Sequence, residues 1–166
     1  MSELPGRILA IDLGDRRVGL AMSDPSRIIA QPAGFIERRA GKRPPLTALL
    51  AKASEVGATA FIVGLPLDEA GDDTPRAVEA RRLAHELEAR TGHPARLFDE
   101  RFTTSAALRA VKAMEGSTRG RKGDVDALAA TVLLEQALAH GARIWASEST
   151  NGQHPMTEDR GDGNAV

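Results

Sequence analysis

Residues 8–14 read ILAIDLG, an apolar run that contains one carboxylate, Asp12, and ends at a glycine. A run this apolar is typical of a central β-strand that is buried on both faces. A charged side chain in such a strand costs several kcal/mol of folding free energy unless another group compensates the charge. The segment therefore predicts a sheet built around this strand, with a compensating group beside Asp12.

Two further acidic residues occupy similar surroundings. Glu100 closely follows the apolar stretch ARLF, and Asp126 lies within VDALAATVLL. Three acids in apolar surroundings suggest a shared counter-charge, and the simplest is a divalent metal ion. Carboxylate oxygens favour Mg²⁺ or Mn²⁺, and two such ions about 4 Å apart can activate water for phosphodiester hydrolysis. No histidine lies near these acids in the sequence, so a zinc site is not expected.

Each acid also has a simpler explanation. Asp12 begins an Asp-x-Gly segment, in which aspartate favours a turn through local hydrogen bonds. Glu100 belongs to a charged run at the end of an expected strand, and such runs are usually solvated. Asp126 is expected in the first turn of a helix, where the helix dipole stabilises a carboxylate. The three acids indicate a site only if the fold brings them together.

The size of the chain, 166 residues, is that of one domain with a substantial core. It contains no cysteine, which excludes disulfide bonds and thiolate metal sites. The N-terminal segment MSELPGR lacks an apolar signal core, and no stretch approaches the ~20 apolar residues that cross a bilayer. We therefore expect a cytoplasmic protein without membrane contact. We also expect a folded domain over residues 1–146 and a disordered polar tail over residues 147–166.

The net charge of −1 conceals an uneven distribution. Residues 147–166 carry four acidic residues and one arginine, which leaves +2 for residues 1–146. Two basic patches on a nearly neutral body favour transient binding of a polyanion, although ordinary solvated surface explains the first patch equally well. The chain has only 4 Phe, 1 Trp and no Tyr, so nucleic acid would be bound mainly through its phosphates. The patches consist of Arg38, Arg39, Lys42 and Arg43, and of Arg109, Lys112, Arg119, Arg121 and Lys122.

The apolar pattern predicts an α/β fold with a mixed sheet flanked by helices. Three strands joined by short turns form an antiparallel meander, and Pro32 places the third at an edge or bends it. Two later strands alternate with helices, and right-handed crossovers place them parallel to the first strand. Residues 115–123 contain three glycines and no apolar anchor, which predicts a mobile basic loop. The expected strands cover residues 7–13, 17–23, 27–37, 59–64 and 94–99, and the expected helices cover 46–56, 75–92, 103–113 and 124–140.

Four segments, in this order, closely resemble the YqgF family: ILAIDLGDRRVGLAMSD, FIVGLPLDEAGDDTPRA, LFDERFTTSAA and KGDVDALAATVLLEQAL. The resemblance covers roughly residues 7–139, and the joint occurrence of four ordered motifs makes it specific. It implies a ribonuclease H-like fold and kinship with Holliday junction resolvases. Members of the family are described as nucleases that mature the 16S ribosomal RNA precursor, which implies a hydrolase acting on phosphodiester bonds.

The resemblance implies that Asp12, Glu100 and Asp126 are metal-binding catalytic acids, at the family's IDxG, DER and VDxxAA positions. By their position in the DERFTT segment, Arg101 and Thr104 would support an acid or contact a phosphate. For Thr104, a helix N-cap is an equally good explanation.

Other parts of the motifs are expected at the same edge of the sheet. Residues 64–66 match the family's VGLP turn, which would line the site. Arg16, in the turn after the first strand, is a candidate phosphate ligand, and an ordinary surface arginine is an equally good explanation. The loop residues expected to clamp a nucleic-acid backbone are Arg119, Arg121 and Lys122.

Two positions depart from the family pattern. Ala106 stands where many relatives have glutamate, which weakens a capping interaction and leaves the chemistry unchanged. A fourth metal-site acid of the resolvases falls on Gly123 here, and Asp124 is no substitute because it points to a different side of the helix from Asp126. We therefore expect the second metal ion to bind weakly until substrate phosphate completes its site.

These features predict a small nuclease that uses Mg²⁺ or Mn²⁺ and acts on precursor 16S ribosomal RNA. Asp12 and Asp126 would anchor the ions, and Glu100 would hold one ion and orient the attacking water. The closest alternative is a resolvase of four-way DNA junctions, which normally needs a two-fold dimer; we expect a monomer or a weak homodimer. A non-catalytic nucleic-acid-binding factor is a second alternative, and an actin-like ATPase is disfavoured because the chain is too short for two lobes.

Overall fold

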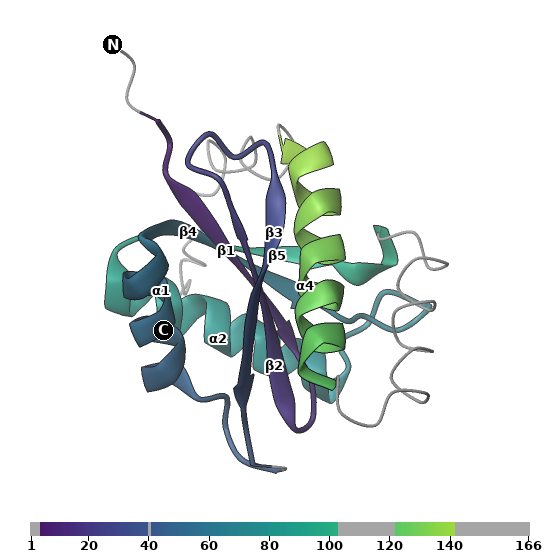
Figure 1. The fold of residues 1–166 in the computed structure, drawn as a ribbon. Coiled ribbons are helices and arrows are strands. Elements are labelled where there is room, and N and C mark those ends of the chain that lie inside the picture. The colour runs from purple at the N-terminus through teal and green to yellow at the C-terminus, as the bar shows by residue number, and fades with distance from the viewer. Residues whose placement is uncertain (1–3, 40, 103–121, 142–166) are drawn as a thin grey trace, which may run out of the picture.

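A computed structural model of the chain describes residues 4–39, 41–102 and 122–141 (Figure 1). The predicted helix over residues 103–113, most of the predicted basic loop and the predicted tail lie outside the described residues. None of the described helices is long and apolar enough to cross a membrane. The elements are β1 (Arg7–Leu13), β2 (Arg17–Ser23), β3 (Ala30–Glu37), α1 (Leu46–Val56), β4 (Ala58–Leu65), α2 (Pro75–Thr91), β5 (Ala95–Asp99), the 3₁₀ turn η1 (Glu100–Phe102) and α4 (Lys122–Ala139).

The five strands form one mixed sheet in the order β3-β2-β1-β4-β5. Strands β1, β2 and β3 pair antiparallel, whereas β4 runs parallel to both β1 and β5. The predicted fold class, a three-stranded meander extended by two parallel strands, is therefore confirmed. Strand β1 lies at the centre, and Ile8, Leu9, Ala10 and Ile11 are fully buried, as its apolar sequence predicts.

The two faces of the sheet carry separate cores. Helices α1 and α2 cover one face, and α4 covers the other (Figure 1). Alternate residues of β1 supply the two cores, as expected for a strand with a period of two. The core under α1 and α2 takes Leu9, Ile11 and Leu13 from β1, and the core under α4 takes Ile8 and Ala10.

Helix α2 begins where the sequence predicts. The Thr74 hydroxyl accepts a hydrogen bond from the Ala77 backbone N–H at 3.1 Å and donates one to the Pro66 carbonyl at 2.6 Å. Pro75 follows as the first helical residue, where its missing N–H costs nothing. Gly92, in the left-handed conformation, ends the helix.

Strand β3 lies at the edge of the sheet, as Pro32 predicted, but it begins at Ala30 and not at Arg27. The Asp24 carboxylate accepts hydrogen bonds from the backbone N–H groups of Ser26, Ile28 and Ile29, which closes a turn over this segment. These bonds hold the pKa of Asp24 below its usual range, the bond from Ile29 contributing most. The predicted start of the strand was wrong because this local turn replaces strand pairing.

Helix α4 begins at Lys122, two residues before the predicted start at Asp124. Residues 122 and 123 therefore belong to the helix and not to the predicted loop. The glycine at position 123 suggested a loop, but glycine costs a helix only about 1 kcal/mol relative to alanine. The packing of the following residues of α4 against the sheet outweighs this cost.

Candidate active site on the α4 face of the sheet

Asp12 lies near the C-terminal end of β1, on the face that α4 covers. Its face follows from the strand alternation, since Ile8 and Ala10 belong to the core under α4. Asp12 is partly buried. The central strand therefore presents a carboxylate where its apolar run ends, at the carboxyl end where it lies parallel to β4.

Glycine flanks Asp12 on both neighbouring strands. Gly19 of β2 is its direct partner in the antiparallel pair. On the other side, Val63 of β4 pairs with Ile11, so Gly64 follows at the level of Asp12. Gly19, Asp12 and Gly64 thus form one row across three strands, with a side chain only at its centre.

The backbone of α4 occupies the space above Gly19. A Cβ atom at position 19 would lie 2.1 Å from the carbonyl oxygen of Asp126 and 2.6 Å from its carbonyl carbon. The first turns of the helix can approach β2 this closely only because position 19 has no side chain. The close approach holds Asp126 over the strand that neighbours Asp12.

The Glu100 carboxylate occupies the space above Gly64. A Cβ atom at position 64 would lie 2.8 Å from Glu100 Oε1 and 3.2 Å from Leu133 Cδ2. Glu100 is the first residue after β5 and belongs to η1, so it approaches the row from the side opposite to Asp126. The fold therefore brings the three predicted acids to one face and one end of the sheet.

The counter-charge beside Asp126 is an arginine. Arg17 Nε donates to Asp126 Oδ2 at 2.6 Å, and the exposed fractions of the two side chains are 28% and 17%. Among the described residues, no three acidic or histidine side chains are close enough together to form a ready metal cluster. Arg17 was not predicted from the sequence, because 109 positions separate it from Asp126. The only local signal was a basic residue two positions before Gly19, on the same face of β2.

The other predicted phosphate ligands occupy different surroundings. The guanidinium of Arg101 binds Asp99, with Nη2 2.7 Å from Oδ2, and lies against Gly71. This hydrogen-bonded pair lowers the pKa of Asp99 and raises that of Arg101. Arg16 is exposed in the turn between β1 and β2. Residues 104, 119 and 121 lie outside the described part of the chain, and residue 122 begins α4.

Helix α2 holds the turn that carries Arg16. Arg38, only 4% exposed, donates to Glu79 Oε1 at 2.6 Å and to the Gly14 carbonyl at 3.3 Å. Arg76 pairs with both Glu79 and Asp15. The hydrogen bond that Arg38 donates to Glu79 is the main cause that lowers the pKa of Glu79. The β1–β2 turn is thus fixed at the end of the sheet where the three acids lie.

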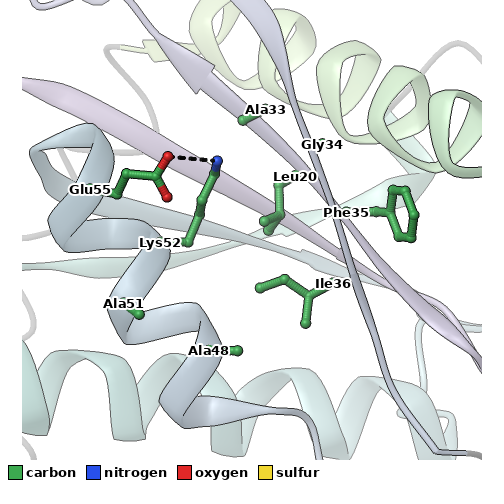
Figure 2. Close-up of a pocket in the computed structure, with 9 residues that line it drawn as sticks. All are labelled: Leu20, Ala33, Gly34, Phe35, Ile36, Ala48, Ala51, Lys52 and Glu55. Carbon is green, nitrogen blue, oxygen red and sulfur yellow. Dashed lines mark ion pairs between the residues drawn. The ribbon is translucent and has the colours of Figure 1, made fainter.

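A cavity of about 420 Å³ lies on the other face, between β3 and α1 (Figure 2). Leu20, Ile36 and the Lys52–Glu55 ion pair line it, and the Phe35 ring points away from it (Figure 2). The sheet separates this cavity from Asp12, so it is not part of the acidic site.

The VGLP residues also differ from the expectation, because Gly64 and Leu65 are in β4 and not in a turn.

Comparison with known proteins places this arrangement in a family. A protein of Roseiflexus sp. (strain RS-1) is 36% identical over 138 residues, which is 83% of this chain and 97% of the relative. One of Koribacter versatilis (strain Ellin345) is 39% identical over 137 residues, 82% of this chain and 89% of the relative. Both are named "Putative pre-16S rRNA nuclease".

A solved structure, T. thermophilus RuvC in complex with Holliday junction substrate, aligns with 81% of this chain and 96% of its own, at 15% identity and a TM-score of 0.49. Residues 6–140 match the model of the RuvX family, described as Holliday junction resolvase. The chain therefore belongs to the RuvX (YqgF) family.

Proposed function

We propose that this protein is a metal-dependent nuclease that hydrolyses phosphodiester bonds during 5′-end maturation of precursor 16S ribosomal RNA. The names of the relatives support the reaction and the substrate. The single observation that carries the assignment to this site is the glycine–aspartate–glycine row. Two strand positions without side chains let α4 and Glu100 approach the central carboxylate. Such a function places the protein in the cytoplasm.

The donor set fits a hard divalent cation. Asp12, Glu100 and Asp126 offer only carboxylate oxygens, which Mg²⁺ and Mn²⁺ prefer. Arg17 engages one oxygen of Asp126, and Oδ1 makes no hydrogen bond with any described residue. When bound, such ions lower the pKa of water and stabilise charge on phosphate oxygens.

Each acid has a separate proposed role. Asp12 and Asp126 would hold the cations, and Glu100, over the β4 backbone, would hold one cation and orient the attacking water. Arg16 and Arg101 lie at the same end of the sheet and are proposed to contact substrate phosphates. The same role is proposed for the residues of the motif and loop that follow, Thr104, Arg119, Arg121 and Lys122.

Resolution of four-way DNA junctions is the second candidate function. The description of the family model favours it. A resolvase must cut two strands symmetrically, which a two-fold dimer achieves. A nucleic-acid-binding factor without catalysis would keep the fold but would not need Asp12, Glu100 and Asp126 on one face.

The test is cleavage of labelled precursor 16S ribosomal RNA and of a labelled four-way DNA junction, with Mg²⁺, Mn²⁺ or EDTA. We expect cation-dependent cleavage of the RNA. Loss of a residue that merely orients a metal ligand costs about 10- to 100-fold, so Asp12→Asn should reduce cleavage by at least about 100-fold. The matched control is Glu55→Gln, which neutralises an exposed acid of α1 beside the cavity on the opposite face. Cleavage of the junction alone would favour the resolvase, and binding without cleavage of either substrate would overturn the nuclease.

A further inference from the structure

We propose that Arg17 is a phosphate-binding residue of this site, positioned by Asp126 to contact the substrate backbone beside the scissile bond. The proposal rests on the proposed nuclease function and assigns a residue that the family motifs did not single out. Arg17 begins β2, two positions before Gly19, so its side chain lies on the face that α4 covers. It therefore lies on the face where Asp12 and Asp126 are found.

The contacts of Arg17 leave its phosphate-binding side unused. A guanidinium has five N–H donors, and the hydrogen bond to Asp126 uses only the one on Nε. Within the described ranges, neither terminal amino group of Arg17 donates to an acceptor. The side chain is 28% exposed, so solvent reaches it. The two terminal groups form the fork that matches a phosphate in two parallel hydrogen bonds.

Anchoring distinguishes Arg17 from the other arginines at this end of the sheet. The guanidinium of Arg38 is buried against Glu79. That of Arg101 binds Asp99 through Nε and Nη2, so among the described residues only its Nη1 is left for a phosphate and the two-pronged contact is lost. Arg16 is exposed, with no ion pair to orient it among the described residues. Because the Asp126 contact already restrains Arg17, a phosphate would immobilise fewer torsions there than on a free surface arginine.

The simpler role for Arg17 is to neutralise Asp126. Both roles predict a loss of stability when Arg17 is replaced, so stability cannot separate them. Binding of nucleic acid without metal can, because a phosphate ligand releases counterions from the nucleic acid and a purely internal ion pair does not.

The experiment measures binding of a labelled 5′ fragment of precursor 16S ribosomal RNA, in EDTA, across a series of salt concentrations. All variants carry Asp12→Asn, and thermal unfolding confirms that each is folded. We expect Arg17→Gln to weaken binding about tenfold, the usual effect of losing a hydrogen bond to a charged group. It should also reduce the slope of log K against log salt by about 0.7–0.9, the contribution of one phosphate. Arg81→Gln, which removes an equal charge from α2, should change neither.

A second variant covers the case in which Arg17→Gln does not fold. Arg17→Lys keeps the charge and loses the fork, so we expect weaker binding with an unchanged salt slope. Affinity equal to that of the parent in Arg17→Lys, or affinity and slope equal to those of Arg81→Gln in Arg17→Gln, would overturn the proposal. Failure of the parent protein to bind the RNA in EDTA would also overturn the proposal, because Arg17 is proposed to bind phosphate without the cation. The proposed function is refuted separately, by the absence of cation-dependent cleavage when Asp12 is intact.

Discussion

Replacement of Gly64 by alanine should separate the stability of the sheet from the position of Glu100. The new Cβ atom would lie 2.8 Å from Glu100 Oε1 and 3.2 Å from Leu133 Cδ2. Ordinary contacts begin near 3.4 Å, so the carboxylate must retreat by about 0.6 Å and the methyl group by about 0.2 Å. Both atoms are the ends of flexible side chains, and the backbone need not move.

The expected cost in stability is therefore small. Overpacking of a core typically costs about 1–3 kcal/mol, and the low end applies where only side-chain ends move. Gly64 does not have a positive φ, so alanine can adopt its backbone conformation. Alanine also lowers the conformational entropy of the unfolded chain, which raises the free energy of unfolding by about 0.4–1 kcal/mol. The free energy of unfolding of Gly64→Ala should lie within about 1 kcal/mol of that of the wild type.

The expected cost in activity is larger. A misplacement of about 1 Å can cost about 100-fold in rate, so a shift of the Glu100 carboxylate by about 0.6 Å should cost about tenfold or more. The assays are single-turnover cleavage and urea unfolding, with Gly141→Ala as the control because a Cβ atom there meets nothing within 4 Å. Wild-type cleavage by folded Gly64→Ala would show that the reaction does not depend on Glu100 occupying this position. A stability loss above about 3 kcal/mol would refute the argument that only side-chain ends move.

Two further changes test the surroundings of the site. Gly19→Ala should lower the free energy of unfolding, measured with urea, by about 3 kcal/mol or more. The reason is that its Cβ atom would meet the backbone of Asp126, which cannot rotate away as a side chain can. A stability equal to that of Gly141→Ala would contradict the close approach of α4. Hydrogen bonds from Arg38 lower the pKa of Glu79 in the folded state, so this pair stabilises the fold above the ordinary pKa of 4.5 and less as pH falls through the lowered value. Glu79→Gln should therefore be about 1 kcal/mol less stable than the wild type at pH 7, with the difference closing on acidification, and a difference that persists unchanged in acid would contradict it.

The apolar pattern predicted most of the fold because burial determines it. Strand β1 and helix α1 have their predicted bounds. Strand β4 differs from the prediction by one residue at each end, and β5 by one residue at its start. The pattern failed at the start of β3, where Ile28 and Ile29 are 75% and 64% exposed. Apolar residues suggested a strand there, but three backbone donors converge on Asp24. A local carboxylate turn overrode the hydrophobic pattern.

Residue chemistry predicted the three acids, but not what positions them. Residue type indicates which side chains can bind metal or phosphate, and Gly19 has no side chain. The three acids suggested one shared cation as the counter-charge, whereas Arg17 compensates the charge of Asp126 directly. Neither contact is visible locally, because each joins β2 to a helix more than one hundred positions away.

One of the two glycines beside Asp12, Gly19, could nevertheless have been predicted from the sequence. The Gly14 N–H donates to the Arg17 carbonyl at 3.0 Å and closes a tight turn, and Leu13 pairs with Val18 beyond it. One further step along this hairpin places Gly19 opposite Asp12. Counting residues from a turn cannot identify Gly64 as the other neighbour of Asp12. Strands β1 and β4 are parallel, and the connection between them passes through two strands and α1. Local turn geometry sets an antiparallel register, whereas the packing of the whole sheet sets a parallel one. Only the three-dimensional structure could therefore show that Asp12 has glycine on both sides.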